Sequence, residues 1–145
     1  MPAVNSLSLD AFKKLGAAAR YSFCYCHGEE LLGFVFCFVD GAAYESENFL
    51  WFCKRHDSFA YIDRVIVGPE ARGKGVGAAL YRAVIDAIGK SKGVLTCEVN
   101  TDPPNPASIR FHEGLGFEAV GSATTSGGAK TVRYFEKELT NPDPL

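Results

Sequence analysis

A glycine-rich segment in the middle of the chain carries the residue types and spacing that most clearly indicate chemistry. Residues 72–77, RGKGVG, follow the β-branched run 65–67 and precede the apolar run 78–80, so they lie between a predicted strand and a predicted helix. Backbone N–H groups at a helix start are unpaired and carry partial positive charge, and glycine lets a phosphate approach them. Arg72 and Lys74 add full positive charges. We interpret this segment as a phosphate-binding loop.

Two nucleotide motifs fit parts of the segment, each with a defect. Residues 73–78 satisfy the dinucleotide pattern G-x-G-x-x-G/A, and Glu98 lies about the expected distance downstream, but the first glycine is too far from the strand. Residues 68–75 nearly match the nucleotide P-loop, yet Gly75 stands where a hydroxyl should bind Mg²⁺. A glycine-rich turn that binds no phosphate is a further alternative.

The composition is that of an ordinary globular protein and argues against several functional classes. The 145 residues suit one domain with a sizeable core, and 47% are hydrophobic and 22% are charged. At a net charge of −2, no global positive field recruits nucleic acid or an anionic membrane, and no apolar run approaches the ~20 residues that span a bilayer. The N-terminus also lacks the features of a secretory signal.

The five cysteines indicate neither a disulfide framework nor a metal centre. Their number is odd, and they mostly lie in apolar runs, where reduced cysteine behaves as a small hydrophobe. Cys24 and Cys26 have no second pair to complete a zinc site, so we predict no metal. These features favour the reducing cytoplasm.

Periodicity and turn residues predict an alternating series of helices and strands. The expected elements are a helix at 8–20, strands at 21–26 and 31–39, a short helical turn at 49–52, a strand at 59–67, a helix at 76–90, a strand at 94–99, a loop at 100–106, a helix at 106–114, a strand from 116, a hairpin loop at 122–129 and a strand at 130–138. The apolar run 31–39 suggests burial on both faces, and the run 65–67 is typical of a buried strand. Residues 59–99 form a β–loop–α–β unit, whose two strands should be parallel.

A second segment, residues 105–117, resembles the closing signature of the GNAT N-acetyltransferase superfamily, Asn-x-x-Ala/Ser-x-x-x-Tyr-x-x-x-Gly-Phe. The loop Arg72-x-x-Gly75-x-Gly77 is similar to the acyl-CoA pyrophosphate loop of the same family. The two signatures occur in the family's order, and the elements from about residue 21 onward can be placed in its core. The resemblance implies one α/β (α+β) GNAT domain over residues 1–145. Its sheet would be mixed and mostly antiparallel, with a central parallel strand pair splayed to hold acyl-CoA.

Two features depart from the family pattern. GNAT domains usually begin with a strand and two helices, whereas about 20 residues precede the first strand predicted here. Absence of the family's first strand would expose a sheet edge, and an exposed edge invites pairing with another chain. Our hypothesis for this edge is a homodimer that completes the sheet. The second departure is His112, which stands where many relatives have a tyrosine that protonates the leaving thiolate.

The resemblance implies direct acetyl transfer from acetyl-CoA to an amine of a small molecule or peptide. Backbone N–H groups near Ile66 and Val67 would pair with pantetheine and polarise the thioester carbonyl. The residues that the resemblance assigns to CoA are Ile66, Val67, Arg72, Gly73, Lys74, Gly75, Val76, Gly77, Asn105 and Ser108. Solvated loop charge is the alternative for the two cations, and helix N-capping is the alternative for Asn105.

Three residues are candidates for proton transfer. His112 would be the general acid, because imidazole titrates near neutral pH, and packing beside Phe111 is its alternative. Glu98 is the leading candidate base, with exposure to solvent as its alternative. Asp63 is the next candidate, with pairing to Arg64 as its alternative. A reaction without a dedicated base also fits the family.

The surroundings of these residues suggest an acceptor but leave a second function open. Asp63, Glu98 and Asp102 together would attract a cationic amine. Four aromatic residues either line the acceptor pocket or belong to the core: Tyr44, Trp51, Phe52 and Tyr61. A non-catalytic module that binds acyl-CoA, in which His112 and Glu98 are structural, is the alternative to the enzyme.

Overall fold

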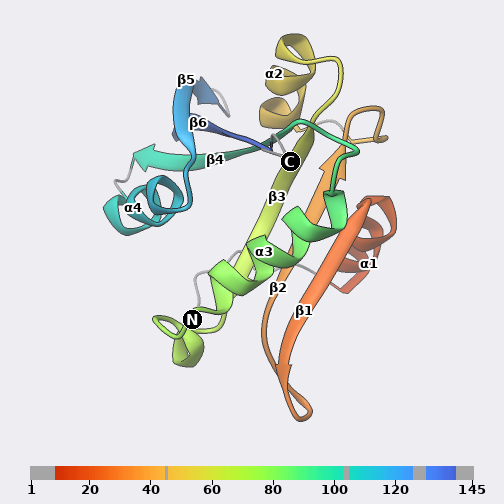
Figure 1. Cartoon of the computed structure of the whole chain (residues 1–145), viewed down its shortest axis with the longest axis vertical. Helices are drawn as coiled ribbons and strands as arrows, with labels where there is room; N and C mark the ends of the chain where they lie inside the picture. The colour runs from red at the N-terminus through yellow and green to blue at the C-terminus, as the bar shows by residue number, and fades with distance from the viewer. Residues whose placement is uncertain (1–8, 45, 103–104, 126–129, 140–145) are drawn as a thin grey trace, which may run out of the picture. The chain divides into compact units, whose positions relative to one another are not determined.

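The structure is a computed structural model that describes residues 9–44, 46–102, 105–125 and 130–139. The chain forms two compact units. The first comprises Met1–Tyr44 and Ile62–Gly89, and the second comprises Glu45–Tyr61 and Lys90–Leu145. Strand β3 (Ala60–Val67) contributes to both units (Figure 1).

The first unit is built on a β-hairpin covered by a helix. Its elements are α1 (Leu9–Ala18), β1 (Tyr21–His27), β2 (Glu30–Val39), the end of β3, the 3-10 turn η1 (Pro69–Ala71) and α3 (Val76–Ile88). The two hairpin strands are antiparallel, and α3 packs on both (Figure 1). A Cβ at Gly33 would lie 2.8 Å from the carbonyl oxygen of Ile66 and 3.1 Å from Val76, so only glycine permits this close approach.

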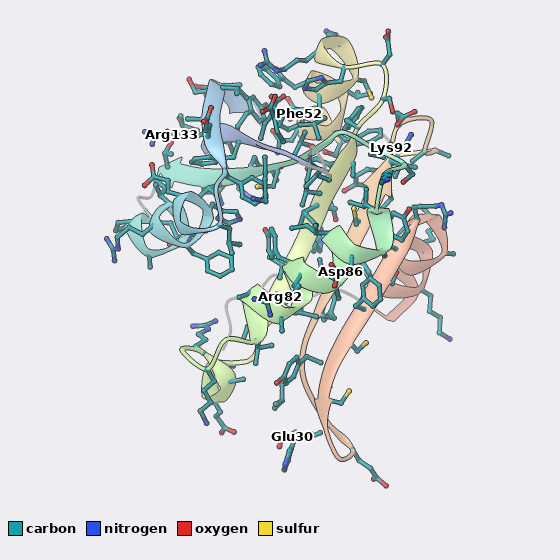
Figure 2. All side chains as sticks on the ribbon, viewed as in Figure 1. Glu30, Phe52, Arg82, Asp86, Lys92 and Arg133 are labelled. Atoms are coloured by element: carbon teal, nitrogen blue, oxygen red, sulfur yellow. The ribbon has the colours of Figure 1, made fainter. Side chains whose placement is uncertain are left out.

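The second unit packs α2 (Glu47–Arg55) and its aromatic side chains against strands. Its other elements are β4 (Val94–Asp102), α4 (Pro106–Gly114), β5 (Glu118–Thr125) and β6 (Lys130–Glu138). Phe52 is fully buried, and its ring centroid lies 5.2 Å from that of Tyr134 on β6. Figure 2 shows Phe52 between α2 and the strands of this unit. Trp51 stacks on Tyr134 at 4.1 Å, so these aromatic residues form the core of the unit.

Hydrogen bonding links the six described strands in the order β1-β2-β3-β4-β6-β5, with β1 and β5 at the edges. The predicted parallel pair is confirmed, because Ala60 and Tyr61 of β3 lie opposite Leu95 and Thr96 of β4. The buried hydroxyl of Thr96 donates to the Ala60 carbonyl oxygen at 2.9 Å and holds the two strands together. The pairings of β1 with β2 and of β6 with β4 and β5 are antiparallel, so the mixed, mostly antiparallel sheet is also confirmed.

Several predicted boundaries are wrong for identifiable reasons. Residues 49–52 belong to a longer helix, α2, whose start is capped where the Oγ of Ser46 accepts the N–H of Phe49 at 3.1 Å. Strand β4 continues through the expected loop as far as Asp102, because Asn100 and Asp102 pair with β6. Strand β5 likewise continues to Thr125, again through pairing with β6.

Two predictions of burial are also wrong. Strand β2 is buried from Val35 inward, but Leu31 is 52% exposed because it lies at the outer end of the hairpin. In β3 the buried residues are 60–62, and the apolar run 65–67 next to the glycine loop is only half-buried. Residue 8 of the expected first helix and residues 126–129 of the hairpin loop lie outside the described residues. Every described helix is too short or too polar to cross a bilayer.

Candidate functional site

The glycine loop of the first unit is an open cradle of backbone. Strand β3 ends at Val67, the N–H of Gly68 donates to the Leu32 carbonyl oxygen at 2.9 Å, and η1 leads into the loop. Gly73 and Gly75 have φ angles of 77° and 82°, which L side chains rarely adopt. A Cβ on either glycine would meet no atom of the described residues within 4 Å, so the loop leaves open space for a ligand.

The start of α3 adds partial and full positive charge to this cradle. Gly75 is the N-cap residue, and no side chain caps this helix. The Gly75 carbonyl oxygen accepts the N–H of Ala79 at 3.0 Å, as the first backbone hydrogen bond of the helix. The N–H groups of residues 76–78 come before this bond, in the turn whose N–H groups have no acceptor within a helix. Arg72 and Lys74 are both exposed, and the Nε of Arg72 donates to the Val67 carbonyl oxygen at 3.4 Å. Glycine backbone, a helix start and two cations fit the pyrophosphate of CoA.

A cavity of about 680 Å³ opens beside the loop within the first unit. The outer ends of β1 and β2 line one side of it, and Glu70, Lys74 and Val76 line the other. No sequence pattern indicates this cavity, because the hairpin and the glycine loop are about 40 residues apart in the chain. Lys74 therefore belongs to the glycine loop and also lines the cavity.

In the second unit, Asn105 begins α4 by capping it. Its Oδ1 accepts the N–H of Ser108 at 3.2 Å, and Pro106 occupies the first turn. Asn105 therefore caps the helix, which is the alternative role considered for it from the sequence. Ser108 is half-buried, and its carbonyl oxygen faces His112 one turn along the helix.

His112 is buried in an aromatic environment. The side chain is 5% exposed, its ring is stacked with Phe135 at 6.0 Å, and it meets Phe111 and Phe117 edge-on. The Nδ1 atom lies 2.7 Å from the Ser108 carbonyl oxygen, which can only accept, so Nδ1 carries the proton and donates it. Burial lowers the pKa of His112, and this hydrogen bond offsets only part of the shift. The imidazole is therefore neutral at neutral pH.

Glu98 lies half-buried on β4, beside two phenols. The hydroxyl of the buried Tyr61 donates to its Oε1 at 2.7 Å, and Tyr134 lies opposite it in the pairing of β4 with β6. The hydroxyl of Tyr134 donates to the Oδ1 of Asn48 at 2.8 Å. Burial raises the pKa of Tyr134, and the negative charges of Glu98 and Glu47 raise it further. Two carboxylates thus act on one phenol and make this region negative.

Asp63, the other candidate base, is in the first unit and is held by two donors. The hydroxyl of Tyr44 and the Nε of Arg64 both donate to its carboxylate, the latter at 3.1 Å. The side chain of Asp63 is 7% exposed. The alternative role considered for Asp63, an ion pair with Arg64, is observed. The side chain of Asp102 lies outside the described part of the chain.

The family was identified by comparison with known proteins. The sequence model of the Acetyltransferase (GNAT) family matches residues 3–117. The chain belongs to this family. The matched range includes the glycine loop, Glu98 and His112, so the resemblance read from the two signatures is confirmed.

Curated GNAT relatives match about half of this chain. An N-acetyltransferase of Streptomyces griseus is 35% identical over 79 residues, which are 52% of this chain and 40% of that protein. An aminoglycoside N(6')-acetyltransferase type 1 of Klebsiella pneumoniae is 33% identical over 81 residues, with the same two shares. The chain thus spans less than half of the length of these two relatives.

Solved GNAT structures match most of the fold. Ard1 from Thermoplasma volcanium superposes with a TM-score of 0.73 and 20% identity, covering 92% of this chain and 81% of that one. A NatC complex bound to Gag peptide and CoA gives a TM-score of 0.69 and 15% identity, covering 95% of this chain and 84% of that one. At these identities the likeness shows the fold alone, and it confirms the predicted fold class.

The sequence did not reveal the partners of Glu98. Tyr61 was considered as a pocket or core residue, but its hydrogen bond to Glu98 depends on the parallel pairing of β3 and β4. Tyr134 and Asn48 carry no sequence signal, because they meet only through the packing of α2 on β6. The pairing of Glu98 with Tyr134 follows from strand register, which the spacing of residues does not specify.

Proposed function

We propose that this protein is an N-acetyltransferase that moves an acetyl group directly from acetyl-CoA to an amine. The observation that carries the proposal is the open glycine cradle at the start of α3, in a chain of the GNAT family. Acetyl-CoA, the acetyl donor used by this family, supplies an activated thioester when bound. The protein's part is to bind this donor, polarise its carbonyl and manage protons.

Donor binding is assigned to the glycine loop and the strand before it. Backbone N–H groups of residues 73–77 and the side chains of Arg72 and Lys74 hold the pyrophosphate. The N–H groups near Ile66 and Val67 face the pantetheine and the thioester carbonyl. The half-burial of this apolar run supports the assignment, because a bound pantetheine chain would cover it. Asn105, which also caps α4, and Ser108 contact the CoA arm.

Glu98 is the proposed general base, and it removes a proton from the acceptor amine. Its support is the hydrogen bond from Tyr61, which fixes the direction of one carboxylate oxygen. Asp63 is the second candidate, but two donors already occupy its carboxylate. We therefore place Glu98 first.

His112 is the proposed general acid for the leaving thiolate. Because burial lowers its pKa, the doubly protonated imidazole is scarce at neutral pH and more abundant in weakly acidic solution. Proton donation by His112 therefore contributes most below neutral pH. Above its pKa, the thiolate takes its proton from water.

The proposed acceptor is a small molecule or peptide whose amine carries or adjoins positive charge. Support comes from the negative region around Tyr134, where Glu98 and Glu47 both raise the phenol's pKa. The relative from Klebsiella pneumoniae is named for aminoglycosides, and a relative from Streptomyces coelicolor, 35% identical over 72 residues, is named for phosphinothricin. Both names concern amine-bearing small molecules. The net charge of −2 gives no support to a nucleic-acid partner.

We also infer that both compact units belong to one acetyltransferase domain and that the protein works in the cytoplasm. The first inference rests on β3, which runs through both units, and on the family match, which spans parts of each. The second rests on the thiols, because no described cysteine forms a disulfide and three of them are exposed.

The alternative function is a module that binds acyl-CoA without turnover. The observation that favours it is the neutral, buried state of His112, which resembles a packed core histidine more than a proton donor. Such a binding module would use the same glycine cradle as the enzyme, and it would differ only in that the proton-transfer residues have a structural role.

An assay of thiol release from acetyl-CoA across a panel of amines tests the proposal. We expect turnover with at least one cationic amine, and we expect Arg72→Glu to lower kcat/KM by ~100-fold or more through charge reversal at the pyrophosphate. The matched control is Arg82→Glu, an exposed arginine on α3 outside the loop (Figure 2), which should retain activity. Donor binding without turnover for any amine would favour the binding module.

A further inference from the structure

Within the described part of the chain, strand β1 is an edge of the sheet that lacks the usual protections. It lies first in the strand order, and among the described residues it pairs with β2 alone (Figure 1). Its seven residues, YSFCYCH, contain no Lys, Arg, Asp, Glu, Pro or Gly. Charges and prolines on edge strands normally prevent pairing with other chains, so this strand presents a neutral, regular row of backbone groups.

The opposite edge of the same sheet, β5, is protected in the usual ways. Ala119 pairs with Phe135 and Gly121 pairs with Tyr134, so Val120 is an extra residue that bulges from β5 itself. β5 also carries Glu118 and contains Gly121. At β1 the irregularity falls on the inner strand, because Tyr25 pairs with Gly33 and Cys26 with Leu31. The outer strand therefore stays regular.

Exposed apolar surface gathers on the same hairpin. Tyr25 is 39% exposed and Leu31 is 52% exposed, and both lie at its outer half. The burial pattern of β1 changes from alternating to fully exposed after Phe23. Apolar surface next to an unprotected edge marks an interaction site.

We propose that β1 pairs antiparallel with β1 of a second copy of this chain, about a two-fold axis at Cys24. This inference is independent of the proposed function. In that register Cys24 faces Cys24, Phe23 faces Tyr25, and Ser22 faces Cys26. Aromatic pairs opposite each other stabilise such a strand pair, and no like charges meet within it.

The charges that flank β1 complement each other in this arrangement. Arg20 precedes the strand and is exposed, with its guanidinium 4.9 Å from the ring centroid of Tyr21. The hairpin turn carries Glu29 and Glu30 at the other end, and Figure 2 shows Glu30 there. Antiparallel pairing about Cys24 brings Arg20 of one copy beside the turn of the other. A parallel arrangement would instead place like charges together at each end, so the two-fold pairing is favoured.

The oligomeric state at micromolar concentration, measured by light scattering after size exclusion, tests the proposal. We expect a dimer for the native chain and a monomer for Cys24→Lys, which would set two lysines face to face at the axis. The matched control is Ser122→Lys on the other edge strand, β5, which should remain a dimer. Unchanged circular dichroism and melting temperature check that Cys24→Lys is folded. A native monomer, or a dimer that Ser122→Lys breaks and Cys24→Lys leaves intact, would overturn the proposal.

The register has a separate readout in the thiols. Directly opposite residues of an antiparallel pair have Cα atoms ~4.5–5.5 Å apart, within the range of a disulfide. In a Cys26→Ser, Cys53→Ser background, oxidised glutathione should join the two Cys24 thiols into one disulfide and be reduced to two glutathione thiols. We expect a covalent dimer on a non-reducing gel, and none when Ser replaces Cys24. No cross-link in a chain that is dimeric in solution would rule out this register.

Discussion

The two units carry candidate functional groups of different kinds. In the first unit the glycine loop is exposed, and its chemistry comes from backbone N–H groups and two cations. In the second unit the chemistry comes from side chains that are wholly or partly buried and held by hydrogen bonds, Glu98 by the Tyr61 hydroxyl and His112 by the Ser108 carbonyl oxygen. A binding loop made of backbone groups tolerates few residue types within the loop, but it needs few neighbouring side chains to hold it. A site made of buried side chains depends on every neighbour that sets its direction and pKa.

Loss of the carboxylate charge at Glu98 should have the largest effect. Glu98→Gln keeps the size of the side chain and can still accept from Tyr61, but it cannot accept a proton from the amine. We expect kcat to fall by ~100-fold or more, while the affinity for acetyl-CoA is unchanged. Steady-state kinetics with an excess of donor measure this effect. Glu118→Gln, an exposed glutamate on β5, is the control. Equal turnover of Glu98→Gln and the native chain would remove the base role.

A β-branched residue in the glycine cradle should affect donor binding and leave proton transfer untouched. Gly75→Val would force a φ of 82° on a valine and place methyl groups where the pyrophosphate is proposed to lie. We expect the Kd for acetyl-CoA to rise ~10- to 100-fold, as measured by calorimetry. Gly93→Val is the control, because Gly93 lacks a positive φ and a Cβ there meets no atom within 4 Å. Native affinity in Gly75→Val would mean that the donor binds elsewhere.

His112→Phe should have an effect that depends on pH. The native pKa is lowered, so the protonated imidazole exists only below that pKa and disappears as the pH rises through it. We expect the ratio of native to His112→Phe turnover to be several-fold in weakly acidic solution and to approach one in weakly alkaline solution. A pH–rate profile of both proteins measures the ratio. A ratio that stays constant with pH would mean that His112 only packs in the aromatic core.

The smallest effect is expected in the stability of the second unit in acid. Burial raises the pKa of Glu136, but hydrogen bonds and charges from Arg55 and His56 outweigh it and leave this pKa below its ordinary value. The resulting stability is present above the ordinary glutamate pKa and is lost as the pH falls through the lowered value. Because the Arg55 partner is 42% exposed and water screens the pair, we expect ~1 kcal/mol or less. Urea unfolding of Glu136→Gln and of the exposed control Glu138→Gln across this range measures it. An identical pH dependence in both would exclude a contribution from Glu136.

The same contrast explains what the sequence could predict. The glycine loop, its strand and its helix follow from local pattern, and the structure has them with only small boundary errors. The helix α4 follows from Asn105 and Pro106 in the same way. Strand β4 extends beyond its prediction because its pairing with β6 overrides the local turn residues. The burial of His112 and the hydrogen bond of Glu98 depend on packing and register, which spacing along one chain does not specify.

Binding of acetyl-CoA by the glycine loop can be tested by a comparison of melting temperatures. Acetyl-CoA, NAD and ATP with Mg²⁺ are added separately at matched concentration to the native chain and to Arg72→Glu. We predict that acetyl-CoA alone stabilises the native chain, by about 2.7 kcal/mol at ~100 times its Kd, and that Arg72→Glu loses this response. Stabilisation by NAD or by ATP with Mg²⁺, and none by acetyl-CoA, would mean that the glycine loop is not an acetyl-CoA site.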